Sequence, residues 1–185
     1  MIEVEIKLKI KNIDTVKSDL VALGFTESDT LTETDTYFDN KNGDIRKSDN
    51  ALRIRETINH TTKEQFCQIN FKGKKYDNKS MTRPEFETFV KDTNAITGIF
   101  NGLGYYAVAP KVVKLRRLFK SAELHACLDT VEGLGDYLEL ESVIEDESLK
   151  DIELRKINSI LEKLGYSLND TTTSSYLSSL QNLIE

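Results

Sequence analysis

Glutamate and lysine side chains alternate with apolar ones along the first ten residues, MIEVEIKLKI. Glu3, Glu5 and Lys7 occupy odd positions, and apolar residues occupy the even ones. Strict alternation is typical of a β-strand, in which successive side chains point to opposite faces of the sheet. Two carboxylates and an ammonium group therefore share one face. Carboxylates can bind a divalent cation there, and an ammonium group can bind phosphate.

The same alternation recurs in four further stretches that are predicted as strands: ALRIRE, RPEFETF, KVVKLRRLF and GDYLELES. In each, charged residues lie opposite apolar ones, and a lysine ends the stretch INFK. The basic residues on the charged faces are Lys7, Arg53, Arg55, Lys72, Arg83, Lys114 and Arg116, and the glutamates are Glu3, Glu5, Glu85, Glu87, Glu139 and Glu141.

Charged faces on five strands allow two interpretations. If the sheet closes with these faces inward, the interior is a polar tunnel, and amphipathic helices must cover the apolar faces outside. Arginine and lysine side chains could then hold a chain of phosphates while the carboxylates hold Mg²⁺ or Mn²⁺. If the charged faces are instead solvated, the charges form cross-strand ion pairs that contribute little to stability. No Walker A loop offers another phosphate site, because FKGKK lacks the second glycine and the Ser or Thr.

Eight strands and four helices are expected to position these side chains. The strands are predicted over about residues 1–10, 30–39, 51–58, 64–72, 83–90, 111–119, 123–131 and 137–144. The helices are predicted over about residues 13–23, 92–104 and 148–165 and over a final stretch from about residue 176. Residues 39–50 and 73–80 are predicted as polar loops. Short connections between the strands favour an antiparallel sheet, which could close into a barrel.

Composition narrows the class of protein. With 185 residues, 38% of them hydrophobic, the chain can build a sizeable core, and we expect one domain over residues 1–185. A net charge of −6 argues against general nucleic-acid binding. The sequence has neither an apolar run of ~20 residues nor a signal-peptide pattern, so we expect no membrane span and a cytoplasmic location.

The cysteines and histidines are few and far apart in the sequence. Cys67 and Cys127 belong to no Cys-x-x-Cys pair, and we expect both to be free thiols. His60 and His125 are isolated, so a zinc site and a Ser-His-Asp triad both have little support. We therefore expect the chemistry to depend on carboxylates and basic side chains.

The charged stretches, taken in order, resemble the CYTH superfamily, also called triphosphate tunnel metalloenzymes. Glu3-x-Glu5-x-Lys7 is similar to the N-terminal signature of that family, and the resemblance covers about residues 1–180. The other stretches that carry it are Asp35-Thr-Tyr-Phe-Asp39, Leu52-Arg-Ile-Arg55, Phe71-Lys-Gly73, Arg83-Pro-Glu85-Phe-Glu87, Lys114-Leu-Arg116-Arg117, Leu128-Asp129 and Gly133-Leu-Gly135-Asp-Tyr-Leu-Glu139-Leu-Glu141. One Glu-x-Glu-x-Lys is weak evidence, whereas the ordered series is specific.

The resemblance implies an α+β fold: a closed eight-stranded antiparallel β-barrel around a polar tunnel, flanked by helices. It also implies that the tunnel binds a triphosphate with Mg²⁺ or Mn²⁺. The implied metal ligands are Glu3, Glu5, Glu139 and Glu141, and the implied catalytic residues are Glu3, Glu5, Lys7 and Glu139. The implied substrate-binding residues are Lys7, Arg53, Arg55, Lys72, Arg83, Lys114 and Arg116, with Glu85, Glu87 and Asp129 also lining the tunnel.

Within the superfamily, two stretches most resemble the class IV adenylyl cyclases, which convert ATP to cyclic AMP and pyrophosphate. These stretches are Asp129-Thr-Val-Glu-Gly-Leu-Gly-Asp-Tyr137 and Ser175-Tyr176-Leu177. Other members of the family hydrolyse thiamine triphosphate or inorganic tripolyphosphate, and those activities remain alternatives. A polyphosphate- or nucleotide-binding module without turnover is a third, although such a module would not need the four metal-binding glutamates. A homodimer would fit the resemblance.

Overall fold

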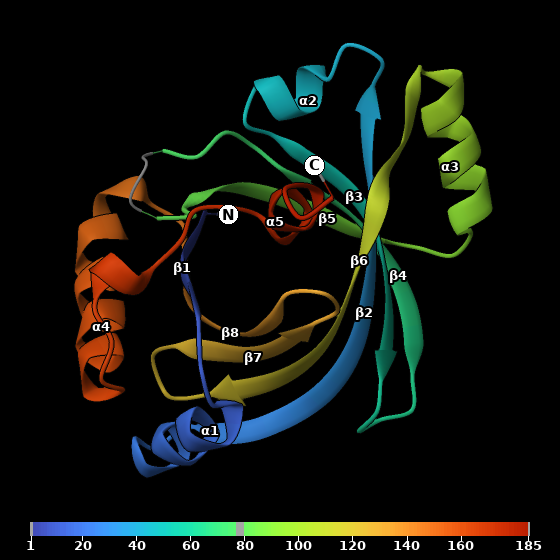
Figure 1. Ribbon diagram of the computed structural model, residues 1–185. Coiled ribbons are helices and arrows are strands. Elements are labelled where there is room, and N and C mark those ends of the chain that lie inside the picture. Colours follow the sequence, from blue (N-terminus) through green and yellow to red (C-terminus); the bar gives the residue numbers. More distant parts are fainter. Residues whose placement is uncertain (1, 77–79, 185) are drawn as a thin grey trace.

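Eight antiparallel strands close into a barrel in the computed structural model, which describes residues 2–76 and 80–184 (Figure 1). Around the barrel the strands follow the order β1-β5-β4-β3-β2-β6-β7-β8, and β8 pairs with β1 to close it. Their bounds are β1 Ile2–Lys9, β2 Thr26–Asn40, β3 Ala51–Asn59, β4 Gln65–Lys72, β5 Arg83–Val90, β6 Tyr105–Lys120, β7 His125–Val131 and β8 Gly135–Ile144. The predicted closed barrel is confirmed.

Strand β1 shows how the alternating pattern is used. Its register against β8 places Glu5 opposite Glu141 and Lys7 opposite Glu139, so the charged residues of both strands share the inner face. The even-numbered apolar residues from Val4 to Leu8 are at most 1% exposed and pack outside the barrel. The charged faces therefore point inward, as the first of the two interpretations requires.

In the described ranges, five α-helices flank the barrel: α1 Ile13–Ala22, α2 Asp44–Lys47, α3 Thr93–Gly102, α4 Lys150–Lys163 and α5 Tyr176–Gln181. Helix α1 begins after Asn12, whose side-chain oxygen accepts hydrogen bonds from the backbone N–H groups of Asp14 and Thr15. It ends before Gly24, which has φ = +89°. Two 3₁₀ turns, Glu147–Leu149 and Leu168–Asp170, lie on either side of α4.

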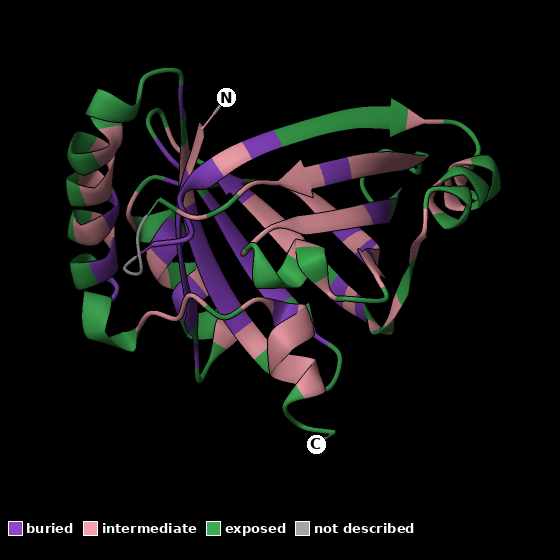
Figure 2. Ribbon diagram, turned by 90° about the horizontal axis from the view of Figure 1, so that it is seen from above, coloured by how far each residue is buried: buried purple, intermediate pink, exposed green. Residues whose placement is uncertain are grey.

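Helices α1 and α4 supply the cover for the apolar outer faces of β1, β7 and β8. Val16 and Leu20 of α1, together with Ile157 and Leu161 of α4, are buried and join the strand side chains in one hydrophobic cluster. In Figure 2, helix α4 turns a buried stripe toward the barrel, whereas α3 on the opposite side of the molecule shows none. The main core thus lies between the barrel and these two helices.

Two strands are longer than the sequence analysis predicted. Strands β2 and β6 pair from Thr26 opposite Lys120 to Asn40 opposite Tyr105, so both extend past the predicted ranges 30–39 and 111–119. The register shifts between Asp35 and Tyr37, where the partner strand contains Pro110. A proline and a bulge locally interrupt the pairing between β2 and β6. The prediction from local pattern therefore left out the part of β6 before residue 111.

The remaining differences are local. The predicted loop 39–50 contains the short helix α2, and the final helix α5 is confined to Tyr176–Gln181. Part of the predicted loop 73–80, namely 77–79, lies outside the described residues. No helix in the described ranges is long and apolar enough to cross a membrane.

Candidate functional site

A cavity of about 680 Å³ lies inside the barrel, and inward-facing charged side chains make up much of its wall. These side chains come from six strands, because each strand contributes its odd- or even-numbered charged face to the interior. The structure brings the following sequence-predicted residues to this cavity: Glu3, Glu5, Lys7, Arg53, Arg55, Lys72, Arg83, Glu85, Glu87, Lys114, Arg116, Glu139 and Glu141. Asp129 lies behind the wall, fully buried.

The first group of charges, which we call the acidic cluster, consists of Glu3, Glu5 and Glu85 around Lys72. The Lys72 Nζ atom lies 2.6 Å from a Glu3 oxygen, 2.9 Å from a Glu85 oxygen and 3.9 Å from a Glu5 oxygen. One ammonium group thus serves three carboxylates from two strands. The cluster carries more negative than positive charge.

The excess of carboxylates affects the pKa values of the acidic cluster. Burial, reinforced by the nearby charge of Glu139, raises the pKa of Glu5 to about 8. Burial and a hydrogen bond with Glu3 raise the pKa of Glu85 to about 7. Burial also acts on Glu3, but the contact with Lys72 outweighs it and holds the pKa of Glu3 below its usual range. A further cation near Glu5 and Glu85 would favour their charged forms.

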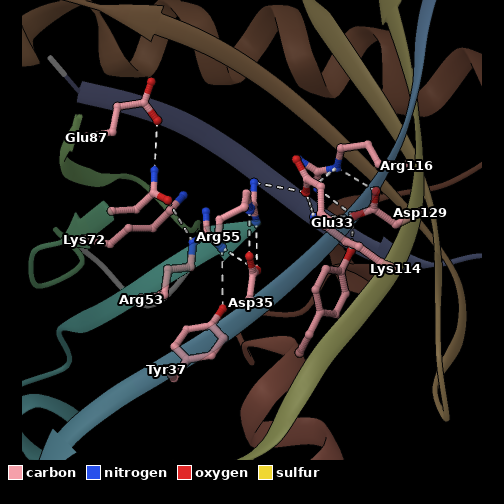
Figure 3. A network of polar contacts seen from close by, with 12 residues as sticks. Glu33, Asp35, Tyr37, Arg53, Arg55, Lys72, Glu87, Lys114, Arg116 and Asp129 are labelled. Atoms are coloured by element: carbon pink, nitrogen blue, oxygen red, sulfur yellow. Dashed lines mark hydrogen bonds and ion pairs between the residues drawn. The ribbon is translucent and has the colours of Figure 1, made fainter. Parts of the chain in front are cut away.

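The second group, which we call the ion-paired network, lies on β2, β3, β6 and β7 (Figure 3). On β3, Arg55 donates two hydrogen bonds to Asp35, of 2.7 and 2.9 Å, and its Nη1 atom lies 3.0 Å from Glu33. Arg53 donates from its Nη1 to Asp35 Oδ2 at 3.0 Å. Asp35 is 1% exposed, so these pairs lie away from bulk water.

The network continues on β6 and β7. Arg116 donates to both oxygens of Asp129, at 2.7 and 2.6 Å, and also to Glu139 on β8. Lys114 Nζ lies 3.2 Å from both Asp129 and Glu33. Burial alone would raise the pKa of Glu33, but the surrounding cations Arg55, Lys114 and Arg116 lower it to about 2. In the ion-paired network, each of the carboxylates Glu33, Asp35 and Asp129 therefore lies beside at least one basic side chain.

Lys7 differs from most of the other cations of the wall. It is 3% exposed and forms no ion pair with a carboxylate of the described residues. Its Nζ atom instead lies 4.4 Å from the centre of the Tyr176 ring, and Lys114 Nζ lies 5.4 Å from the same ring. The Tyr176 hydroxyl donates to Asp129 Oδ2 at 2.9 Å. Burial and the charges of Glu139 and Asp129 raise the pKa of Tyr176, which keeps the phenol protonated.

Three predicted residues have other surroundings. The buried Arg83 has an Nε atom without a hydrogen-bond partner among the described residues. Glu87 accepts a hydrogen bond of 2.9 Å from Asn70, and Glu141 lies 3.8 Å from His125. These residues line the cavity but belong to neither the acidic cluster nor the ion-paired network.

Several residues of this site were given no site role from the sequence, among them Glu33, Asp35 and Tyr176, although Asp35 and Tyr176 stand in stretches that carry the family resemblance. The signal for the first two was present, because strict parity applied to the strand 30–39 places Glu33 and Asp35 on one face, opposite its threonines. Strand parity does not identify Tyr176, which reaches the cavity from a helix at the far end of the chain; the only signal for it was the resemblance of Ser175-Tyr176-Leu177.

The balance of charge bears on whether the site fits a metal ion. The charged interior includes seven basic side chains and nine acidic ones. The basic ones are Lys7, Arg53, Arg55, Lys72, Arg83, Lys114 and Arg116, and the acidic ones are Glu3, Glu5, Glu33, Asp35, Glu85, Glu87, Asp129, Glu139 and Glu141. With every group ionised, the carboxylates outnumber the basic groups by two, so a polyanion would bind more readily if cations came with it.

The donor atoms near Lys72 fit Mg²⁺ or Mn²⁺, which prefer carboxylate oxygens. Three carboxylates already surround one cationic group, Lys72 Nζ, and two of them have raised pKa values that a divalent ion would relieve. In the described ranges no three acidic, histidine or cysteine side chains are already arranged around a metal position. Binding a metal would therefore require these carboxylates to shift from their contacts with Lys72.

The fold and the wall together define a class of protein: a closed barrel whose interior, in place of an aliphatic core, is a polar cavity with basic and carboxylate groups. Comparison with known families agrees, since the CYTH domain family matches residues 1–176. The chain belongs to the CYTH domain family.

Three similar proteins illustrate the relationship. A Methanocaldococcus jannaschii protein named "Putative adenylate cyclase" is 38% identical over 177 residues, which is 96% of this chain and 97% of that protein. Adenylate cyclase CyaB of Aeromonas hydrophila is 26% identical over 94% of this chain and 86% of its own. A solved structure from Pyrococcus horikoshii superposes with a TM-score of 0.87 at 30% identity, over 98% of this chain and 99% of the other.

Proposed function

We propose that this protein is a metal-dependent enzyme that acts on a triphosphate, and specifically an adenylyl cyclase of the class IV type, which converts ATP to cyclic AMP and pyrophosphate. The observation that carries the proposal is the meeting of basic side chains from β1, β3, β4, β5 and β6 with an under-neutralised acidic cluster in one cavity. A metal–triphosphate complex has both charge signs, and this wall presents a complement to each. The names of the two curated relatives support the cyclase.

The basic residues are proposed to bind the phosphate chain. Arg55 and Arg116 are held rigidly by bidentate contacts to Asp35 and Asp129, so their remaining donors are pre-oriented. Lys7 forms no direct ion pair among the described residues, although the charges of Glu139 and Glu5 act on it, so its ammonium group can bind a phosphate oxygen. The proposed set of phosphate-binding residues is Lys7, Arg53, Arg55, Lys72, Arg83, Lys114 and Arg116.

Glu3, Glu5, Glu139 and Glu141 are proposed to hold Mg²⁺ or Mn²⁺, and Glu85 lies close enough to Glu3 to assist. When bound, such an ion would withdraw charge from phosphate oxygens and stabilise the charge that develops on the leaving group. Lys72 would then exchange carboxylate contacts for phosphate contacts. The exchange would leave Glu3 and Glu85 beside a cation throughout, because the metal ion would take the place of the ammonium group.

In the proposed reaction the 3′-oxygen of ATP attacks the α-phosphorus, the bond to the bridging oxygen of pyrophosphate breaks, and the hydroxyl proton leaves with the pyrophosphate or to water. The chain's contribution is to orient the triphosphate and to neutralise the pyrophosphate as it leaves. Apolar residues also line the cavity, among them Phe38, Val108 and Leu177. An apolar section of wall suits a nucleoside and would serve no purpose for inorganic tripolyphosphate, which favours the cyclase over a tripolyphosphatase.

The test is to offer ATP, thiamine triphosphate and tripolyphosphate separately, each with Mg²⁺ or Mn²⁺, and to identify the products by chromatography. Cyclic AMP and pyrophosphate in equal amounts would support the proposal. Release of orthophosphate without cyclic AMP would replace the cyclase with a triphosphatase. Tight binding of triphosphates without any product would leave only the binding module.

A further inference from the structure

The chain segment after α4 returns to the barrel and fastens itself to it at several points. Thr171 forms a β-bridge with Leu8, and the Thr172 N–H donates to the Lys7 carbonyl at 2.7 Å. Further on, the Gln181 side chain donates to the Ala109 carbonyl at 2.9 Å. Gln181 also accepts a 2.9 Å hydrogen bond from Arg46 of α2, and both residues line the cavity.

Between these attachments, Tyr176 inserts into the barrel interior and is 7% exposed. The ammonium groups of Lys7 and Lys114 lie over its ring, at 4.4 and 5.4 Å from the ring centre. Its hydroxyl donates to Asp129, and its edge packs against Tyr137 with the ring centres 5.0 Å apart. The residue therefore touches two cations of the wall and the carboxylate that anchors a third, Arg116.

We propose that Tyr176 is a positioning residue that holds the Lys7 and Lys114 ammonium groups toward the phosphate chain of the substrate, an inference that rests on the proposed function. An aromatic face attracts a cation without cancelling its charge. A carboxylate in the same place would pair with Lys7 and compete with phosphate for it. Tyr176 thus orders the flexible Lys7 side chain without pairing it to a further carboxylate.

The two parts of the tyrosine have separable roles in this inference. The ring face orders Lys7 and Lys114, and the hydroxyl orients Asp129, which already receives Arg116 and Lys114. Tyr176→Phe removes only the hydroxyl and keeps the ring. Tyr176→Leu and Tyr176→Met keep an apolar side chain but remove the ring, and the unbranched Met can refill the space if Leu packs poorly.

The experiment measures binding of inorganic tripolyphosphate with Mg²⁺ to the full chain by calorimetry. Tyr176→Leu and Tyr176→Met should weaken binding about tenfold or more, because two desolvated cation–ring contacts are lost. Tyr176→Phe should stay within about threefold of wild type, since the ring face is kept. Tyr166→Leu is the matched control: Tyr166 packs on the outer core, away from the cavity, and its loss should leave tripolyphosphate binding unchanged.

Two further measurements separate positioning from general packing. In the ligand-free protein, the ε-methylene protons of Lys7 should show an upfield ring-current shift that Tyr176→Phe retains and Tyr176→Leu abolishes. In a double-mutant cycle, Tyr176→Leu should have a much smaller effect on binding when Lys7→Ala is already present. Losses that are equal for Phe and Leu, or effects that simply add to those of Lys7→Ala, would overturn the inference.

Failure of the proposed function would look different. A wild-type protein that binds no tripolyphosphate would overturn the proposed function together with this inference. If wild type binds normally and all three Tyr176 variants bind equally well, the proposed function stands and only the role of Tyr176 is overturned.

Discussion

In the ion-paired network Asp35 receives Arg55 through two hydrogen bonds, whereas in the acidic cluster Glu3, Glu5 and Glu85 share a single ammonium group. The consequences are opposite. The network lowers the pKa of its carboxylate Glu33 to about 2, and the cluster leaves the pKa of Glu5 raised to about 8.

The difference indicates separate roles for the two regions inside one barrel. Buried ion pairs with several hydrogen bonds are rigid and self-neutralising, so the network can present pre-oriented donors. Crowded carboxylates without matching cations are held at an energetic cost by the surrounding fold, and a divalent ion would relieve that cost. The ion-paired network and the acidic cluster should therefore respond differently when a charge is removed from each.

The largest effect is expected from neutralising a proposed metal ligand, either Glu5 of the acidic cluster or Glu139 on β8. Glu5→Gln or Glu139→Gln should abolish turnover, because each removes a proposed metal-ligand charge while keeping the side-chain volume. Activity should likewise vanish with excess chelator and return with Mg²⁺ or Mn²⁺. For Glu5→Gln the melting temperature of the metal-free protein should not fall, since Glu5 is already disfavoured in its charged form. Full activity in excess chelator would rule out a metal-dependent mechanism.

The next largest effect is expected from the cations of the network. Arg55→Ala and Lys114→Ala should each lower kcat/KM by orders of magnitude, because phosphate charge would be left unpaired in a cavity poor in water. Each should also lower the melting temperature, since the carboxylates Asp35, Glu33 and Asp129 lose partners. Steady-state kinetics and thermal unfolding check the two expectations. Mild losses of activity in both variants would mean that these residues do not bind the substrate.

A moderate effect is expected on acid stability. Glu33 has a folded-state pKa of about 2 against an ordinary value of 4.5, so its ion pairs stabilise the fold above about pH 4.5. That stabilisation, up to about 3 kcal/mol, is lost as the pH falls from 4.5 through 2. Glu33→Gln should therefore be less stable than wild type at pH 7 and should lose less stability on acidification. Chemical unfolding at pH 7 and pH 3 measures this, and parallel pH profiles for the two proteins would contradict it.

The smallest effect is expected at Lys11, an exposed residue just past the end of β1. It continues the odd-numbered series of Lys7 but lies beyond the cavity wall, so its charge is solvated and worth little. Lys11→Ala should keep wild-type kcat/KM and melting temperature. A loss comparable with that of Lys114→Ala would mean that position along the strand does not decide which charges matter.

Much of the fold could be predicted from local pattern. Alternation in MIEVEIKLKI and four other stretches predicted the inward charged faces, and the apolar periodicity of α1 and α4 predicted their cover. The pattern failed at Pro110, where long-range pairing with β2 extends a strand past a bulge that local preference treats as an end. Pairing between distant strands supplies hydrogen bonds that no window of sequence can anticipate.

By itself, the sequence determined which strand side chains face the barrel interior, because a strand's period of two is a local property of the backbone. Only the tertiary structure decided how those charges are neutralised. Whether Arg55 meets Asp35, whether Lys72 must serve three carboxylates and whether Tyr176 reaches Lys7 all depend on strand register and on the return of the C-terminal segment. The interaction energy between two charges falls as their separation grows. The packing of the folded chain therefore decides which charges pair.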